Sequence, residues 1–99
     1  MPGSPSTPSS GTTTAGAVTV LVRYFAGAAA AAGREEERLQ VPAGSTVADA
    51  LARVTAAGGP DLARVVAASS FLLQATAARP GDLLPDGAVL DVLPPFAGG

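Results

Sequence analysis

Hydrophobic and polar residues alternate along the stretch 18–25, Val-Thr-Val-Leu-Val-Arg-Tyr-Phe, and some of the intervening positions are apolar as well. This pattern predicts a β-strand buried on both faces, as a central strand of a sheet is. The alanine-rich segment 26–32, closed by Gly33, predicts a short helix. A second alternation over 37–41, ended by Pro-Ala-Gly at 42–44, predicts a strand that forms a hairpin-like pair with the first.

The clearest helix signal begins at Thr46, a good N-cap residue with Asp49 three positions later, close to a capping-box arrangement. Two glycines and a proline at 58–60 predict the end of this helix. Between these limits, the apolar stripe expected to face the core consists of Val47, Leu51 and Val54.

The second half of the chain predicts one further helix and two further strands. Asp61 is expected to cap a short helix over 62–68, and the run 71–76 predicts a third strand. The segment 79–87 is rich in Pro, Gly and Asp, which predicts a loop. The last strand is expected over 89–93, because apolar residues alternate there and the two prolines that follow cannot donate to a strand ladder.

The predicted order is two strands, a helix and two strands. Because the first and last strands are the most apolar, we expect them side by side and parallel in the middle of the sheet. This layout is an α+β roll of the β-grasp (ubiquitin-like) type, with a mixed sheet of about four strands and one main helix packed across it. We assign the β-grasp domain to 17–94, a disordered Pro/Ser/Thr/Gly tail to 1–16 and a flexible Gly-Gly tail to 95–99.

The composition argues against most kinds of side-chain catalysis. The 99 residues include no Cys, His or Lys, so the chain has no thiolate nucleophile, no imidazole base and no Schiff-base lysine. Its six Arg are dispersed among eight acidic residues and the net charge is −2, so we expect no nucleic-acid binding. The weakly polar run 17–32 is too short to span a bilayer and no signal-peptide pattern precedes it, so we expect a cytoplasmic protein.

The carboxylates are expected to have structural rather than catalytic roles, because no close pair suggests acid–base chemistry. The acidic patch 35–37 is expected to be a solvated turn or strand edge. Asp49 is explained as a helix cap, and Asp82 and Asp86 as turn residues. Asp91, on the last strand, is expected to be a solvated or partner-facing group.

The end of the chain, Val-Leu-Pro-Pro-Phe-Ala-Gly-Gly over 92–99, carries the main chemical signal. A terminal carboxylate is a poor electrophile until another protein transfers AMP to it from ATP, in a channel where the terminal residues lie extended. Glycines at 98–99 suit a narrow channel because they have no Cβ, and the prolines at 94–95 direct the segment away from the domain. Phe96 is expected to dock in a partner's pocket, the alternative being that it folds back onto the sheet.

Three segments together carry a resemblance: the opening strand 18–26, the Thr-Val helix start at 46–51, and the Asp-Gly turn, apolar strand and Pro-Pro-x-x-Gly-Gly end over 86–99. They resemble the MoaD/ThiS-type sulfur-carrier family, and within it most of all the small subunits of molybdopterin synthase. The resemblance covers essentially the whole predicted domain, and the Pro-Pro before the double Gly is its most specific element. The sequence departs from the family pattern at Ala88, where an acidic residue is usual, and around Gln74, where an Asn is usual.

The resemblance implies a specific chemistry for the terminal carboxylate of Gly99. An adenylating enzyme (MoeB-like) would activate it with ATP and magnesium, and a sulfur donor would convert the acyl-adenylate to a thiocarboxylate. The large subunit of molybdopterin synthase (MoaE-like) would receive the tail in a heterotetramer of two large and two small subunits, and sulfur would pass to cyclic pyranopterin monophosphate. The carrier would be non-catalytic, with no metal and no tightly bound cofactor. The implied partner-binding tail consists of Leu93, Pro94, Pro95, Phe96, Ala97 and Gly98.

Three alternatives stay open at this point. The sulfur carriers of thiamin and cysteine biosynthesis share the fold and the double Gly. A ubiquitin-like modifier would be joined through its C-terminus to lysines of other proteins, although a chain without Lys cannot be linked to itself through its own side chains. A β-grasp binding module without tail chemistry would use the glycines only as a flexible end.

Overall fold

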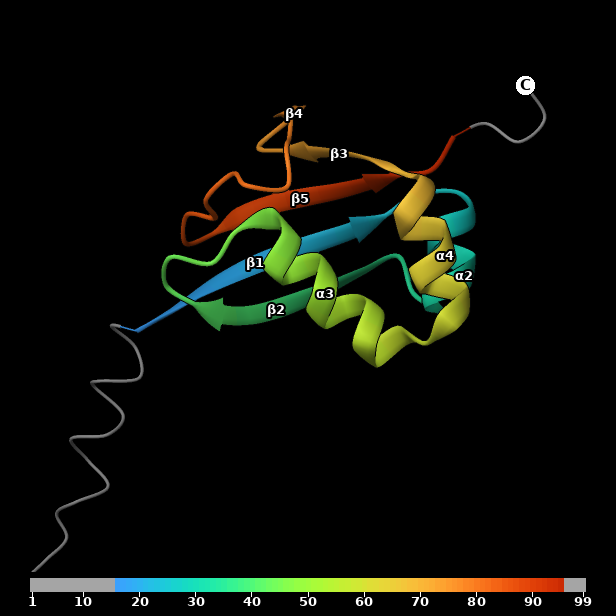
Figure 1. Cartoon of the computed structure of the whole chain (residues 1–99), viewed down its shortest axis with the longest axis horizontal. Coiled ribbons are helices and arrows are strands. Elements are labelled where there is room, and N and C mark those ends of the chain that lie inside the picture. Colours follow the sequence, from blue (N-terminus) through green and yellow to red (C-terminus); the bar gives the residue numbers. More distant parts are fainter. Residues whose placement is uncertain (1–15, 96–99) are drawn as a thin grey trace, which may run out of the picture.

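The computed structural model describes residues 16–95, which form one five-stranded mixed sheet and three helices (Figure 1). In chain order the elements are β1 (Ala17–Tyr24), α2 (Gly27–Ala32), β2 (Glu36–Pro42), α3 (Val47–Gly58), α4 (Pro60–Ala68), β3 (Ser70–Leu73), β4 (Thr76–Ala77) and β5 (Ala88–Leu93). Within the described part of the chain, no helix is long and apolar enough to cross a membrane.

The strands lie in the order β2-β1-β5-β3-β4. β1 and β5 are parallel neighbours, with Val20 beside Ala88 and Tyr24 beside Val92. β1 and β2 form an antiparallel pair on either side of α2 in the sequence. The predicted central parallel pair and the hairpin-like pair are both confirmed, and the fold is a β-grasp.

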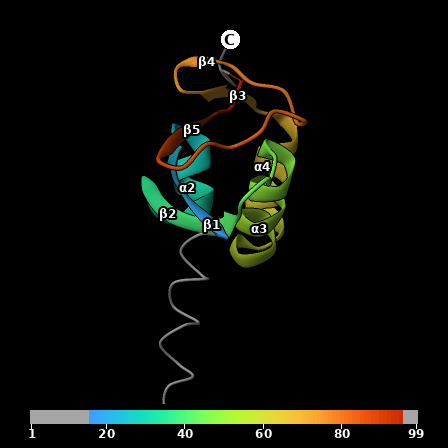
Figure 2. The ribbon, with the colours of Figure 1, turned by 90° about the vertical axis from the view of Figure 1, so that its left-hand side faces the viewer.

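The core lies between the sheet and the two longer helices, α3 and α4, which cover one face (Figure 2). Val22 and Leu90, paired across β1 and β5, are fully buried, and burial of side chains of this size contributes about 1.5–3 kcal/mol each. From the helices, the largest fully buried side chains are Val47 of α3 and Leu62 of α4. Of the stripe predicted for α3, Leu51 is only partly buried.

The helix α3 begins with the predicted cap. The Thr46 hydroxyl accepts a hydrogen bond from the Asp49 backbone N–H at 3.3 Å, and the Asp49 carboxylate accepts one from the Thr46 N–H at 2.9 Å. This reciprocal pair is a complete capping box, which satisfies two N–H groups that would otherwise lack partners at the helix start.

The start of α4 differs from the prediction that Asp61 caps it. The helix begins at Pro60, preceded by Gly59 at a φ of 90°. Proline is well suited to the first helical position because its fixed φ matches the helix and the N–H it lacks would be unpaired there. Asp61 instead lies in the first turn, where it forms an exposed ion pair with Arg64 at 3.2 Å.

The strand predicted over 71–76 is wrong as a single element. The chain turns at Gln74 and Ala75, whose φ values are 52° and 65°, so the segment forms the end of β3, a turn and the start of β4. The sheet therefore has five strands rather than about four. The left-handed backbone at two consecutive non-glycine residues is uncommon, and apolar alternation does not reveal it.

The predicted tails lie largely outside the described residues. Of the segment 1–16, only Gly16 is described, and its carbonyl accepts a hydrogen bond from the Ala43 N–H at 2.9 Å. Of the segment 95–99, only Pro95 is described. The limits assigned to the domain and to its two tails stay predictions.

Candidate functional site

The candidate site is the end of β5, where the chain leaves the sheet. Val92 lies between Tyr24 of β1 and Phe71 of β3, and its carbonyl accepts a hydrogen bond from the Phe25 N–H at 3.3 Å. Leu93 makes the last pair, with Ser70. The strand therefore stays bound on both sides up to its final residues.

After Leu93, the two prolines end the pairing because neither has an N–H to donate. Pro94 is partly buried and Pro95 is exposed, so the chain passes from the sheet into solvent over these two positions. The remaining residues predicted for the site lie outside the described part of the chain: Phe96, Ala97, Gly98 and Gly99. Docking of Phe96 in a partner stays a prediction.

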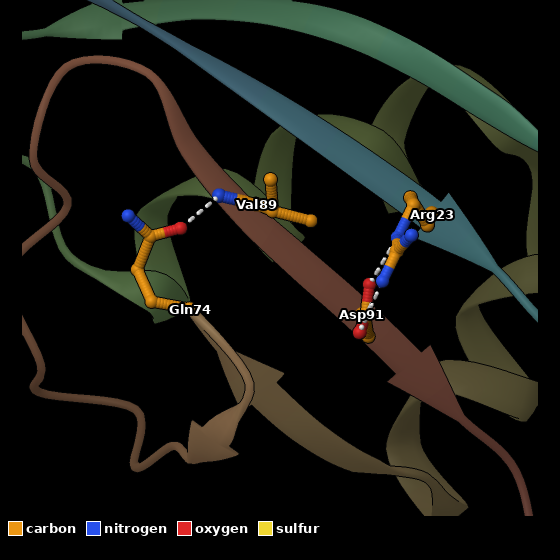
Figure 3. A network of polar contacts seen from close by, with 4 residues as sticks. All are labelled: Arg23, Gln74, Val89 and Asp91. Atoms are coloured by element: carbon orange, nitrogen blue, oxygen red, sulfur yellow. Dashed lines mark hydrogen bonds and ion pairs between the residues drawn. The ribbon is translucent and has the colours of Figure 1, made fainter.

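An ion pair lies two residues before this exit. Asp91 of β5 faces Arg23 of β1, with its two carboxylate oxygens 2.7 Å from Nε and 3.0 Å from Nη2 (Figure 3). The Asp91 side chain is 7% exposed, so the prediction that it is solvated is wrong. It is covered because strand pairing places Arg23 directly beside it, and these charge-assisted bonds satisfy it. The hydrogen bond and charge of Asp91 also raise the pKa of Arg23 above its usual range.

A second contact holds the beginning of β5. The Val89 N–H donates to the side-chain oxygen of Gln74 at 2.8 Å (Figure 3). The Gln74 N–H in turn donates to the Val89 carbonyl at 2.9 Å. Gln74 thereby continues the β3–β5 pairing with both its backbone N–H and its side-chain oxygen, although its φ of 52° already belongs to the turn. The departure from the family's usual Asn thus lies at a residue that shapes this turn.

The acidic patch 35–37 lies at the same end of the sheet. Glu35 and Glu36 are exposed, as predicted, whereas Glu37 is partly buried. The Glu37 carboxylate accepts a hydrogen bond from the Tyr24 hydroxyl and forms an ion pair with Arg34 at 3.4 Å. Burial and the bond to Glu37 raise the pKa of Tyr24, which therefore stays protonated well into the alkaline range.

Three other carboxylates bind backbone N–H groups, which agrees with the predicted cap and turn roles. Asp82 accepts from the Arg79 N–H at 2.9 Å within its loop, and Asp86 accepts from the Thr19 N–H of β1 at 2.8 Å. Asp49 belongs to the capping box described above. Within residues 16–95, no three His, Cys, Asp or Glu side chains gather as they would around a metal ion. These three carboxylates therefore hold a loop, the turn before β5 and a helix start.

The sequence analysis missed two contacts that define the exit of β5. Nothing in the local pattern indicates that Arg23 and Asp91 are paired, because the two residues are 68 positions apart. The contact between Phe25 and Val92 likewise depends on the register of β1 and β5. Both contacts could have been predicted only from the register of the parallel pair β1 and β5, that is, from which residue of one strand lies beside which residue of the other.

Solved structures show the same fold. SAMP1 from Haloferax volcanii is 30% identical, with a TM-score of 0.74 over 82% of this chain and 99% of that one. A putative molybdopterin converting factor subunit 1 from Pyrococcus furiosus is 26% identical, with a TM-score of 0.73 over 80% and 99%. A complex of subunits 1 and 2 of the molybdopterin-converting factor from Helicobacter pylori contains a chain that is 20% identical, with a TM-score of 0.60 over 83% and 100%.

A search of curated protein sequences found no significant match. The model of the ThiS family, in contrast, matches residues 22–99, which is most of the chain. The match includes β5, the two prolines and the terminal double Gly. Family members are small carrier proteins that work with partner subunits. On this match, together with the shared β-grasp fold, the chain belongs to the ThiS family of MoaD/ThiS-type sulfur carriers.

Proposed function

We propose that this protein is the sulfur-carrier small subunit of a molybdopterin synthase and that Gly99 carries the sulfur. The observation that supports this most is the family match, which runs to residue 99 and so includes the terminal Gly-Gly. In this chain, the double Gly follows a strand that is paired on both sides up to Val92 and with β3 up to Leu93, after which two prolines end the pairing.

The chemistry takes place on one carboxylate and is supplied by partners. An adenylating enzyme transfers AMP from magnesium-bound ATP to the Gly99 carboxylate and releases pyrophosphate. A sulfur donor then displaces AMP, which leaves a C-terminal thiocarboxylate. The role of the carrier is to present this group at the end of a narrow, extended segment, for which residues without a Cβ are suited. No residue of the carrier acts as base or nucleophile in these steps.

The molybdopterin pathway is favoured over the other sulfur-dependent pathways by the Pro-Pro-x-x-Gly-Gly ending and by two similar structures. The proteins from Pyrococcus furiosus and Helicobacter pylori are both described as subunit 1 of a molybdopterin-converting factor, and the second is in complex with subunit 2. We therefore propose a synthase large subunit as partner, two of each subunit in the complex, and the cytoplasm as location. Sulfur would pass from Gly99 to cyclic pyranopterin monophosphate.

A protein-modifier function is the second candidate, and a specific observation favours it. SAMP1 of Haloferax volcanii is 30% identical to this chain, and a further structure of the same kind is described as small archaeal modifier protein 1. A modifier would use the same activated carboxylate but would transfer the carrier itself to an amino group. Thiamin- or cysteine-biosynthesis carriers would stop at the thiocarboxylate and deliver sulfur elsewhere.

Reconstitution separates these functions. Thiocarboxylated carrier is mixed with a molybdopterin synthase large subunit and cyclic pyranopterin monophosphate, and molybdopterin formation is followed. The proposal predicts molybdopterin in proportion to the thiocarboxylate added, and no product from unloaded carrier. Covalent conjugates of the carrier with lysines of other proteins, without molybdopterin, would assign the modifier function. Loading without either product would point to another sulfur pathway and would overturn the assignment to molybdopterin synthase.

A further inference from the structure

An open groove of about 390 Å³ lies between α3 and α4, the two helices that cover one face of the sheet (Figure 2). The side chains that line it are apolar, with one hydroxyl among them, and none carries a charge. From α3 come Ala48, Leu51, Ala52 and Thr55, from α4 Val66 and two alanines, and from β3 Phe71. The groove is thus an apolar surface on the helical side of the domain.

This helix groove provides a bound segment with almost no hydrogen-bonding partner. Thr55 is the one polar side chain in its lining, and its hydroxyl already donates to the Ala52 carbonyl at 3.2 Å. A charged side chain would lose its hydration there without compensation, and so would the backbone N–H groups of an ordinary extended segment. The lining therefore favours an uncharged segment whose inward-facing residues have no N–H, and proline is the residue with that property.

One segment of this chain has the matching composition. Residues 2–15, which lie outside the described part of the chain, include no charged side chain, and prolines recur there at every third position: Pro2, Pro5 and Pro8. Polyproline II has three residues per turn, so this spacing places the prolines along one edge of an extended segment. Two successive prolines are then about 9 Å apart, and the groove runs about 10 Å along α3 from Ala48 to Thr55.

This N-terminal segment is attached close enough to reach the groove. The Gly16 carbonyl accepts a hydrogen bond from the Ala43 N–H at 2.9 Å, and Ala48 follows Ala43 in the sequence by five positions. Five residues span at most about 18 Å, whereas the eight from Pro8 to Gly16 span up to about 26 Å. A tethered segment also has an effective concentration on the order of 1 mM, so a contact that is weak between separate molecules becomes populated within one molecule.

We propose that the helix groove is covered by the N-terminal segment of the same molecule, with Pro5 and Pro8 packed against Leu51, Val66 and Phe71. The contact covers apolar surface that would otherwise be open to other chains. This inference goes beyond the carrier function, since it uses no residue assigned to the C-terminal tail. Loading of Gly99 would stand whether or not the segment docks.

The test uses a single spin label, which is possible because the chain has no Cys. Full-length Ser6→Cys carries a nitroxide between the two prolines, and the methyl NMR signals are compared with the label oxidised and reduced. We expect the signals of Leu51 and Val66 to lose most of their intensity with the oxidised label. Leu21 and Val89, which are paired across β1 and β5 on the other face of the sheet, should keep most of theirs.

A pair of double variants tests the prolines in the labelled protein. Pro5→Ser with Pro8→Ser should reduce the intensity loss in the groove to that of Leu21, because the inward-facing residues then carry N–H groups that the groove leaves without partners. Thr12→Ser with Thr13→Ser changes the same number of residues in the same segment and should leave the loss as it is. Neither double variant alters a residue of the domain, so both test the contact without changing the groove.

A second pair of variants tests the groove itself. Ala52→Glu places a charge in the lining and should also abolish the selective loss at Leu51 and Val66. Ala30→Glu makes the same change at an exposed alanine of α2 and should preserve it. Thermal unfolding checks that both are folded. If Ala52→Glu does not fold, the proline variants decide alone.

Mixed samples distinguish the segment of the same molecule from that of a second copy. Spin-labelled protein without isotopes is mixed with isotope-labelled protein without the spin label. The proposal predicts no selective loss at Leu51 and Val66 in this mixture. An equal loss in the mixture would assign the groove to a second copy and overturn the proposal. Equal intensities in the groove and at Leu21, or a loss that the proline variants leave unchanged, would overturn it as well.

Discussion

Asp91 and Arg23 form a two-point ion pair across the central strands, and it lies two residues before the last residue of β5. The two side chains are unequally covered, since Asp91 is 7% exposed and Arg23 is 45% exposed. Removal of the arginine would therefore leave a carboxylate that water can hardly reach, whereas removal of the aspartate would leave a guanidinium that water can solvate.

The unequal burial of the two side chains predicts the order of stability of three variants. Arg23→Leu should have the lowest free energy of unfolding of the three. Asp91→Leu and the double Leu variant should both be more stable than Arg23→Leu. The double variant leaves no buried carboxylate without donors. Urea unfolding of the wild type and the three variants gives the coupling free energy of the pair. Purely additive effects, with the double variant as unstable as the sum of the two single ones, would contradict this account.

The raised pKa of Tyr24 predicts a loss of stability in alkali. The unfolded chain loses the phenol proton near pH 10, while the folded chain keeps it to higher pH, so stability is complete below about pH 10 and falls as the pH rises toward the folded value. The slope is at most about 1.4 kcal/mol per pH unit. Tyr24 is the sole Tyr and the chain has no Lys or Cys, so no other side chain titrates in this range.

Urea unfolding of wild type and Tyr24→Phe at several pH values between about 9 and 12 measures this effect. The wild-type stability should fall with pH, and that of Tyr24→Phe should stay nearly flat, whatever its absolute value. The α-amino group has already lost its proton in both proteins. Parallel curves for the two proteins would show that Tyr24 does not carry a raised pKa.

The capping box of α3 predicts a measurable loss when its hydroxyl is removed. Thr46→Ala should lower the free energy of unfolding by about 1 kcal/mol, because the Asp49 N–H loses its acceptor at the helix start. Thr46→Ser keeps the hydroxyl and serves as the control, with an expected change of less than half as much. Chemical unfolding of both variants makes the comparison. A loss as large for Ser as for Ala would assign the effect to the methyl group rather than to the cap.

The sequence predicted the features that depend on local pattern or on apolar content. The box at Thr46 and Asp49 was visible because both partners lie within one helical turn. The pairing of β1 with β5 followed from their apolar residues, because the most buried strands belong in the middle of the sheet. The sequence therefore predicted where the main helix α3 begins and how β5, the strand before the tail, runs in the sheet.

The features that the sequence analysis missed depend on the sign of the backbone angle φ or on the register between strands that are distant in the sequence. The left-handed turn at Gln74 and Ala75 interrupts a run that the sequence indicates as one strand. Asp91 is on the expected side of β5, but we expected a solvated or partner-facing group, because its partner Arg23 lies 68 positions away in the sequence. The helix groove likewise requires three separate elements to meet, which no single pattern indicates.

The most direct test of the carrier function is the intact mass of the protein after loading. Wild-type protein and a variant lacking Gly99 are incubated with the adenylating enzyme, magnesium-ATP and a sulfur donor. The account predicts that wild type gains the mass of one oxygen replaced by sulfur, at the C-terminal residue, and that the shortened variant is unchanged. An unchanged wild-type mass with an enzyme that loads another carrier, or loading of the variant without Gly99, would contradict it.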